Sequence, residues 1–317
     1  MKASVIIPSY NEETTLPLLL KDLEVQTLRD FEVIVADAAS TDKTRECARQ
    51  GGAIIVDGGM PAVGRNAGAA RATGEILVFL DADVRIPRTF LEAATTEMDE
   101  RQLAAATAQA LPASDLAIDR LIHRFANLFV RLNQERDPHA PGYCILARRS
   151  VVEAIGGFDE TIKVAEDHDF VRRAARHGPF RMLNNASFHV DVRRYEKEGR
   201  IAYSLKAARV TAYRAMHGEI TDDSVVEYEF GDFEAEDKTT AQKALRKIEE
   251  GLIAMDTSVQ ALEREMEEAL KQGAREVERY REKLEEFGTY IADAGRALFG
   301  QDDDTEDTDD TEGDQGN

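Results

Sequence analysis

Two aspartates separated by one residue follow an apolar run in this 317-residue chain. Asp81 and Asp83 come directly after Ile76–Leu80 (ILVFL), a run typical of a strand that is buried on both faces. Residues two apart in a strand point the same way, so both carboxylates can face one ligand. Mg²⁺ and Mn²⁺ take one or two protein carboxylates and complete their shell with phosphate oxygens and water. The pattern predicts a nucleoside-diphosphate site, with Asp81 toward a ribose and Asp83 toward the metal.

Acidic residues also follow two earlier apolar runs. Ala3–Pro8 is followed by Ser9-Tyr10-Asn11 and then Glu12, and Phe31–Ala36 is followed by Asp37. These groups would share one edge of a sheet, where like charges repel unless a cation or a donor-rich ligand lies between them. Helix caps and turns are the alternative explanation, and we assign it to Asp42.

The spacing of these runs defines the fold class. Val-, Ile- and Leu-rich segments alternate with helix-period stretches at 14–26, 41–50 and 62–72. Repeated strand–helix–strand units predict an α/β fold with an open, mostly parallel sheet flanked by helices. In such sheets ligands bind beyond the carboxyl ends of the strands, where the acidic residues lie.

Four segments in order resemble family-2 glycosyltransferases. They are Ser4-Val5-Ile6-Ile7-Pro8-Ser9-Tyr10-Asn11-Glu12-Glu13, Glu32-Val33-Ile34-Val35-Ala36-Asp37 with Ser40-Thr41-Asp42, Arg65-Asn66-Ala67-Gly68-Ala69-Ala70-Arg71-Ala72-Thr73-Gly74-Glu75, and Phe79-Leu80-Asp81-Ala82-Asp83. The resemblance covers roughly residues 3–200. It implies a GT-A fold, a nucleoside-diphosphate sugar donor (a UDP-sugar is favoured), a divalent metal (Mn²⁺ or Mg²⁺) and inversion of the anomeric centre.

The same resemblance implies a role for each matched residue. Three residues would line the nucleotide pocket: Pro8, Tyr10 and Glu12. Asp37 would accept a hydrogen bond from the base, Arg65 would contact the base or phosphates, Asp81 would bind the ribose, and Asp83 would bind the metal. The chain departs from the family at Ala38 and Lys43, where glycine is common, and both changes alter the loop near the base.

A second acidic group lies in the half of the domain expected to bind the acceptor. Gly142–Arg148 has the pattern of another buried strand, and Glu166-Asp167 begins a helix that runs to about Arg176. Inverting transfer needs one general base for the acceptor hydroxyl. By resemblance to the family's Glu-Asp signature, we assign Asp167 as this base and Glu166 to the binding of acceptor or sugar hydroxyls. Favourable interaction with the helix dipole is the alternative.

Further candidates follow near residue 190. His189 lies in an alternating stretch that has the pattern of an exposed strand, and it is a candidate metal ligand because several GT-A enzymes supply a late histidine. Arg193 and Arg194 are candidates for the diphosphate, since guanidinium groups suit phosphate oxygens. A structural or solvent-facing role is the alternative for all three.

An amphipathic helix is predicted over 115–135. Its apolar side either packs on the sheet or a partner, or lies on a membrane surface that presents a lipid-linked acceptor.

Charge divides the chain near residue 218. Residues 1–218 hold 29 Lys/Arg and 30 Asp/Glu, whereas residues 219–317 hold 11 and 31. We predict a glycosyltransferase domain over 1–218, an acidic helical or coiled-coil region over 219–300 and a disordered acidic tail over 301–317. Heptad spacing over 245–298 predicts self-association or a partner. The acidity fits a high-salt cytoplasm or an interaction tail equally well.

Composition excludes several classes of protein. A net charge of −21 argues against nucleic-acid binding, and two cysteines cannot form a disulfide framework. No run of 18 apolar residues and no signal peptide are evident, so we expect a cytoplasmic protein, with peripheral contact at the inner face of the membrane as an option. The predicted function is metal-dependent inverting transfer of a sugar to a glycan or lipid-linked acceptor. The alternatives are a sugar-1-phosphate nucleotidyltransferase and a non-catalytic coiled-coil assembly protein.

Overall fold

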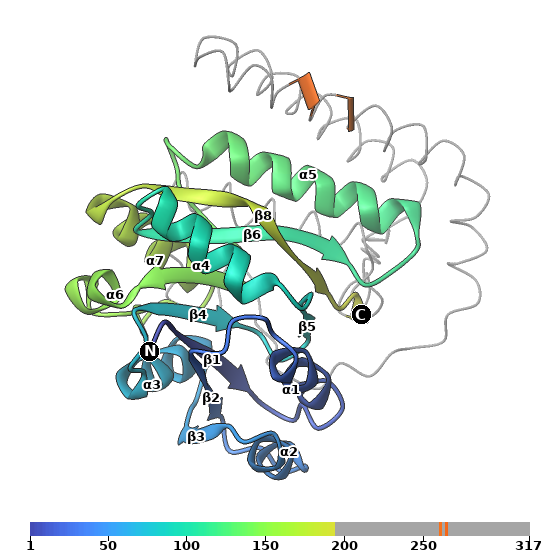
Figure 1. The fold of residues 1–317 in the computed structure, drawn as a ribbon, viewed down its shortest axis with the longest axis vertical. Coiled ribbons are helices and arrows are strands. Elements are labelled where there is room, and N and C mark those ends of the chain that lie inside the picture. Colours follow the sequence, from blue (N-terminus) through green and yellow to red (C-terminus); the bar gives the residue numbers. More distant parts are fainter. Residues whose placement is uncertain (194–259, 262–263, 266–317) are drawn as a thin grey trace, which may run out of the picture.

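A computed structural model describes residues 1–193, 260–261 and 264–265 (Figure 1). Its first half alternates strands and helices as predicted, in the order β1 (Ala3–Ser9), α1 (Leu16–Glu24), β2 (Phe31–Asp37), α2 (Thr44–Gln50), β3 (Ile54–Asp57), α3 (Pro61–Arg71) and β4 (Ile76–Leu80). The second half continues with β5 (Val84–Arg85), α4 (Phe90–Glu100), β6 (Ala105–Pro112), α5 (Ala117–Asn133), β7 (Cys144–Arg148), α6 (Arg149–Ile155), α7 (Glu166–Ala174) and β8 (Phe180–Val190).

One eight-stranded sheet runs through the described residues in the order β3-β2-β1-β4-β7-β6-β8-β5. The pairs among β3, β2, β1 and β4 are parallel, as is β6 with β8. Strand β7 is antiparallel to both of its neighbours, and β5 is antiparallel to β8. The prediction of a mostly parallel sheet flanked by helices is confirmed, and β7 makes the sheet mixed.

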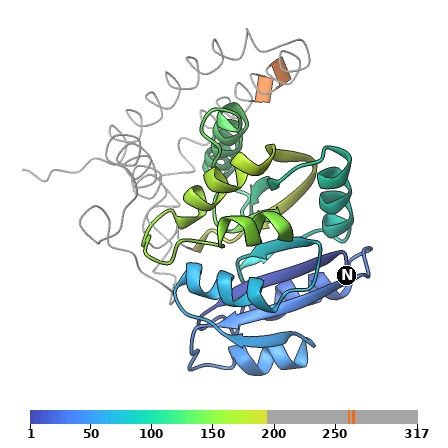
Figure 2. The ribbon, with the colours of Figure 1, turned by 90° about the vertical axis from the view of Figure 1, so that its left-hand side faces the viewer.

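Helices cover both faces of the sheet (Figure 2). One core cluster joins the sheet to α1 and α4, through residues such as Leu16 and Phe90, and the other joins it to α6 and α7, through Val152 and Phe170. Helix α3 lies on the second face, close to β1. A Cβ on Gly68 would stand 2.3 Å from Cγ2 of Ile6. Glycine is therefore required there, and it fixes the position of α3 on the sheet.

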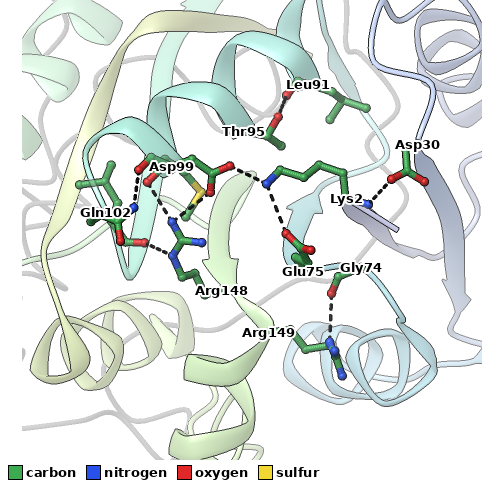
Figure 3. A network of polar contacts seen from close by, with 12 residues as sticks. Lys2, Asp30, Gly74, Glu75, Leu91, Thr95, Asp99, Gln102, Arg148 and Arg149 are labelled. Atoms are coloured by element: carbon green, nitrogen blue, oxygen red, sulfur yellow. Dashed lines mark hydrogen bonds and ion pairs between the residues drawn. The ribbon is translucent and has the colours of Figure 1, made fainter.

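A network of charged side chains lies at the edge of the sheet where the parallel strands begin (Figure 3). Lys2, just before β1, contacts Asp99 of α4 at 2.5 Å and Glu75, just before β4, at 3.3 Å. Arg148, at the end of β7, donates to the other oxygen of Asp99 at 3.1 Å. This network ties four elements together at the edge opposite to the carboxyl ends of β1 and β4.

The amphipathic helix predicted over 115–135 is α5, and it packs on the sheet. Its buried residues include Ile118, Leu121 and Leu128, whereas Phe129 is 36% exposed. The Asn127 side chain makes two hydrogen bonds with the backbone of Ala110 in β6. Its Oδ1 accepts from the N–H at 3.0 Å, and its Nδ2 donates to the carbonyl oxygen at 2.8 Å. Of the two options for this helix, packing on the sheet is therefore observed.

The stretch around His189 differs from the prediction of an exposed strand. It belongs to β8, which lies between β6 and β5, and Phe188 is fully buried. Sequence alternation is present, but helix α4 covers the apolar face, where the ring of Phe90 lies 6.4 Å from that of Phe188. His189 itself is exposed.

Three predicted regions lie outside the described residues. These are the acidic helical region over 219–300, including the association segment 245–298, and the tail over 301–317, apart from four positions between 260 and 265. Among the described helices, none combines the length and apolarity that crossing a bilayer would need.

Candidate active site

Four carboxylates and one guanidinium meet at the carboxyl edge of the sheet. Glu12 follows β1, Asp81 and Asp83 follow β4, and Asp191 follows β8. Arg193 lies among them: its Nη2 is 3.6 Å from Oε2 of Glu12 and 3.9 Å from Oδ2 of Asp83, and its Nε donates to Asp191 at 3.0 Å. The sheet topology therefore brings together acidic residues from three strands, as the sequence predicted for Glu12, Asp81 and Asp83.

The charge of this cluster is only partly balanced. Loss of hydration and the nearby charges of Asp81 and Glu12 raise the pKa of Asp83 to about 7, although a third of its side-chain surface is exposed. Loss of hydration also raises the pKa of Glu12, against the hydrogen bond from Thr15 and the charge of Arg193. Such groups favour any added positive charge, because a nearby cation stabilises their ionised forms.

These residues fit a divalent cation that is completed by its ligand. Within the described residues, no group of three or more His, Cys, Asp or Glu side chains forms a metal site by itself. A cation carried by a diphosphate needs only one or two protein carboxylates, and Asp83 presents an accessible one among acidic neighbours. The donor set is oxygen only, which suits Mg²⁺ or Mn²⁺.

The structure places two of the candidates near residue 190 differently. His189 pairs with Arg85 of β5 and is exposed, and no contact joins it to Asp83 among the described residues. Its assignment as a metal ligand gains no support from this geometry. Arg193 lies inside the carboxylate cluster, whereas Arg194 lies outside the described residues.

Two loops beside the cluster are interlocked. The backbone N–H of Asn11 donates to Ser40 at 3.0 Å, and that of Glu12 donates to Thr44 at 2.7 Å. Asp42 accepts from the backbone N–H groups of Thr44 at 2.9 Å and Glu13 at 3.0 Å, so it orders the loop before α2. The loops after β1 and β2 therefore form one rigid wall.

Asp37 lies at the base of this wall. It is 1% exposed, and its Oδ2 accepts from the Ser40 backbone at 3.2 Å and from Arg45 at 3.0 Å. Its Oδ1 is buried without a hydrogen-bond partner. A buried carboxylate oxygen normally has a partner, so this oxygen is suited to accept from a ligand. Of the other predicted pocket residues, Pro8 is buried within β1 and Tyr10 is half-buried at its end.

Arg65 lies between the two halves of the site. Its guanidinium donates from Nη1 to Glu166 at 2.7 Å, and from Nη2 to Asp81 and to the carbonyl oxygen of Gly142, both at 3.1 Å. The residue is 3% exposed. The contacts described for Arg65 are with protein groups, and its contact with base or phosphate stays a prediction.

The predicted catalytic pair opens α7. Ala165, just before the helix, has a left-handed backbone (φ 65°), which turns the chain sharply into Glu166 and Asp167. Burial and the neighbouring charge of Asp167 raise the pKa of Glu166, against the effect of Arg65. One oxygen of Asp167 accepts from the His168 backbone at 2.8 Å. A Cβ on Gly142 would lie 3.1 Å from the other oxygen, Oδ2.

Sequence reasoning missed two residues of this site. One is Asp191, whose spacing in Asp-Val-Arg allows its Oδ1 to accept from the backbone N–H of Arg193 at 2.8 Å. Gly142 was assigned only to a strand, although the strand begins at Cys144 and Gly142 lies against Arg65. No sequence signal marks Gly142, because its neighbours come from distant segments.

Comparison with known proteins agrees with this geometry. Residues 4–156, slightly less than half of the chain, match the sequence model of glycosyl transferase family 2. The matched range includes β1 to β4 with the carboxylates that follow them, and it supports a family-2 glycosyltransferase.

Curated relatives share parts of this segment. The chain is 42% identical over 92 residues to the 4,4'-diaponeurosporenoate glycosyltransferase of Staphylococcus haemolyticus, covering 26% of this chain and 24% of the relative. It is 33% identical over 174 residues to the undecaprenyl-phosphate 4-deoxy-4-formamido-L-arabinose transferase of Pseudomonas aeruginosa, covering 48% of each. The chain thus spans about half or less of the length of these relatives.

Among solved structures, the mannosyltransferase PcManGT of Pyrobaculum calidifontis, in complex with GDP-Man and Mn²⁺, is similar in fold. The TM-score is 0.53 at 21% identity, and the match covers 95% of this chain and 88% of that chain. This similarity agrees with the GT-A fold of the described sheet.

Proposed function

We propose that the protein is a metal-dependent, inverting glycosyltransferase that moves a sugar from a nucleoside-diphosphate donor to an acceptor hydroxyl. The observation that carries the proposal is the juxtaposition of two acidic groups. Glu12, Asp81 and Asp83 cluster at the carboxyl edge of the sheet, and Arg65 bonds both to Asp81 and to Glu166 at the start of α7. The family match over residues 4–156 supports the same enzyme class.

Donor binding uses the first half of the sheet. Asp37 offers a buried, unpartnered oxygen to an imide N–H, which favours uracil and hence a UDP-sugar. Asp81 binds the ribose, and Asp83 holds Mn²⁺ or Mg²⁺ through its accessible oxygens. Arg193 shifts from the carboxylates toward the diphosphate, because phosphate oxygens are strong acceptors for a guanidinium. The metal, when bound, neutralises charge on the leaving diphosphate.

Transfer uses the second half. Asp167 takes the proton of the acceptor hydroxyl while that oxygen forms its bond to the anomeric carbon. The bond from the anomeric carbon to the phosphate oxygen breaks, and the nucleoside diphosphate leaves with that electron pair. Glu166, bonded to Arg65 at 2.7 Å, accepts hydrogen bonds from sugar or acceptor hydroxyls. One displacement inverts the anomeric centre.

A lipid-linked acceptor is favoured over a free glycan. Three neighbouring rings connect the exposed face of α5 with the segment of the general base Asp167. The ring centroid of Phe129 is 5.2 Å from that of His139, which is 5.1 Å from that of His168, the residue after Asp167. Two relatives are named for isoprenoid compounds, diaponeurosporenoate and undecaprenyl phosphate. Liposome flotation with Phe129→Glu and Phe125→Glu tests this choice. Equal flotation of wild type and variants, or flotation by neither, counts against it.

A donor panel tests the function. UDP-, GDP- and dTDP-sugars are offered with Mn²⁺ or Mg²⁺, and binding is followed by calorimetry and sugar release by chromatography. We expect metal-dependent binding that Asp83→Ala abolishes. The exposed Asp115→Ala is the matched control. Formation of a nucleotide sugar from a sugar 1-phosphate would instead favour the nucleotidyltransferase alternative.

A further inference from the structure

We propose that the guanidinium of Arg193 is a displaceable counter-ion, which keeps free divalent cations away from Asp83 until a diphosphate arrives. The inference rests on the proposed function and adds to it an order of binding, in which the metal enters together with the nucleotide.

Arg193 lies among carboxylates that follow three different strands. Its Nη2 is 3.6 Å from Oε2 of Glu12, after β1, and 3.9 Å from Oδ2 of Asp83, after β4. Its Nε donates to Asp191, after β8, at 3.0 Å. Among the described residues, Arg193 is the one cationic side chain that forms an ion pair with Asp83. The proposed metal ligand therefore already has a positive partner, which the protein itself supplies.

The two ends of the guanidinium are held differently. Asp191 holds one end, since its Oδ1 accepts from the backbone N–H of Arg193 at 2.8 Å and its Oδ2 accepts from Nε at 3.0 Å. At the other end, the distances of 3.6 and 3.9 Å from Nη2 to Glu12 and Asp83 are longer than a hydrogen bond. Charge attraction acts there without a fixed bond. Nη2 can therefore leave both carboxylates without breaking a hydrogen bond to either.

A free cation gains little at this position. Nη2 is 3.9 Å from Oδ2 of Asp83, so an ion bound to that oxygen would be repelled by a like charge beside it. In the part of the chain that the structure describes, no three His, Cys, Asp or Glu side chains are placed to hold a metal by themselves. The carboxylates around Arg193 thus surround a guanidinium and do not converge on one small ion. Free Mn²⁺ or Mg²⁺ must compete with Arg193 for Asp83.

A diphosphate reverses this balance. Phosphate oxygens accept strong, charge-assisted hydrogen bonds, and the planar fork of an arginine suits them. Once Nη2 turns to the phosphates, Asp83 loses its positive partner and becomes available to a cation whose other positions the phosphate oxygens fill. Metal and nucleotide then favour each other's binding, and linkage makes this effect reciprocal. Arg193 therefore carries part of the coupling between the two ligands.

Calorimetric titrations with MnCl₂, with and without saturating UDP, test the proposal; GDP replaces UDP if the donor panel selects it. The proteins are the wild type, Arg193→Gln, Arg193→Lys and the control Arg88→Gln, which removes an exposed arginine from the loop before α4. The titrations are made at pH 8, above the pKa of Asp83, so that protons compete little with the metal.

We expect free Mn²⁺ to bind Arg193→Gln roughly three- to tenfold more tightly than the wild type, since interactions between partly exposed charges are modest. The factor by which UDP raises the affinity for Mn²⁺ should fall by about tenfold or more in the same variant, because the guanidinium no longer couples the two ligands. Arg193→Lys retains the positive charge and should retain most of the exclusion. Arg88→Gln should match the wild type in both titrations.

Asp83→Ala combined with Arg193→Gln locates the gained affinity, and the double variant should lose it. A gain that persists there would place the ion elsewhere and overturn the inference. Free Mn²⁺ that binds Arg193→Gln no more tightly than the wild type would overturn it too, as would an equal gain in Arg193→Lys, because charge would then not be the cause. A wild type that binds no nucleotide with or without Mn²⁺ would overturn the proposed function as well.

Discussion

Nη2 of Arg193 lies 3.9 Å from Oδ2 of Asp83, so residues that follow β8 and β4 share one charged cluster. Glu12 and Asp191 complete the surroundings of this guanidinium, at 3.6 and 3.0 Å. Arg193 partly neutralises acidic groups that would otherwise repel one another. When a diphosphate enters with its cation, the same guanidinium is in reach of a stronger acceptor.

Arg193→Gln should weaken binding of UDP in the presence of Mn²⁺ by about 10- to 100-fold, because a charge-assisted hydrogen bond is worth roughly 1.5–3 kcal/mol. Calorimetry measures the change, and Arg88→Gln, an exposed arginine in the loop before α4, is the control. Unchanged affinity in Arg193→Gln would show that this guanidinium serves only the carboxylates of the protein.

Asp167→Asn should retain donor binding and lose transfer. The amide keeps the size and the oxygen that accepts from His168, at 2.8 Å in the wild type, but it cannot take the acceptor proton. Loss of a general base lowers kcat by about 100- to 10,000-fold. Single-turnover transfer at saturating donor is the measurement. Transfer at the wild-type rate would make the assignment of the base wrong.

The raised pKa of Asp83 predicts a pH-dependent effect on stability. Its pKa is about 7 in the folded protein and 3.8 as the ordinary value. The unfolded chain therefore releases this proton first as the pH rises, and folding stability falls between about pH 4 and pH 7. The amide of Asp83→Asn cannot ionise, so position 83 should no longer lower the folding stability as the pH rises.

In thermal melts with EDTA, Asp83→Asn should exceed the wild-type Tm by more at pH 8 than at pH 5. Each kcal/mol corresponds to roughly 2–4 °C for domains of this size. Asp115→Asn, at an exposed carboxyl, should show no such difference. A Tm difference for Asp83→Asn that is independent of pH would contradict the raised pKa of Asp83.

Asn127→Ala should lower the free energy of unfolding by roughly 2–3 kcal/mol, because it leaves the buried N–H and C=O of Ala110 without partners. These groups now bind the Asn127 amide at 3.0 and 2.8 Å. Asn133→Ala, on the same helix with its amide bonded to an exposed carbonyl, is the control for denaturant melts. Equal stability of the two variants would mean that the two bonds between Asn127 and Ala110 contribute little to stability.

The first half of the fold could be predicted because its strands are parallel and apolar throughout. Strands β1, β2 and β4 are uninterrupted Val-, Ile- and Leu-rich runs, and acidic residues follow each of them at the carboxyl edge of the sheet. Strand β6 was not predicted. Its sequence AATAQALP is rich in alanine, which has little strand preference, and only its neighbours β7 and β8 make it a strand.

The sequence predicted individual residues of the candidate site, but not the contacts that join them. Residue types and their positions after apolar runs singled out Asp81, Asp83 and Asp167, and their binding of ligand stays a prediction. The bond between Arg65 and Glu166 could not be foreseen, because they are 101 positions apart and pairing depends on how α3 and α7 pack. For the same reason, the contact of Gly142 with both Arg65 and Asp167 became visible only in three dimensions.

The most direct measurement is a crystal structure of the protein soaked with MnCl₂ and UDP, with the anomalous signal used to locate the metal. The account predicts Mn²⁺ bound to Asp83 and to both phosphates, the ribose beside Asp81, and the base against Asp37. A manganese ion and a nucleotide that bind elsewhere, away from the edge formed by β1 and β4, would contradict it.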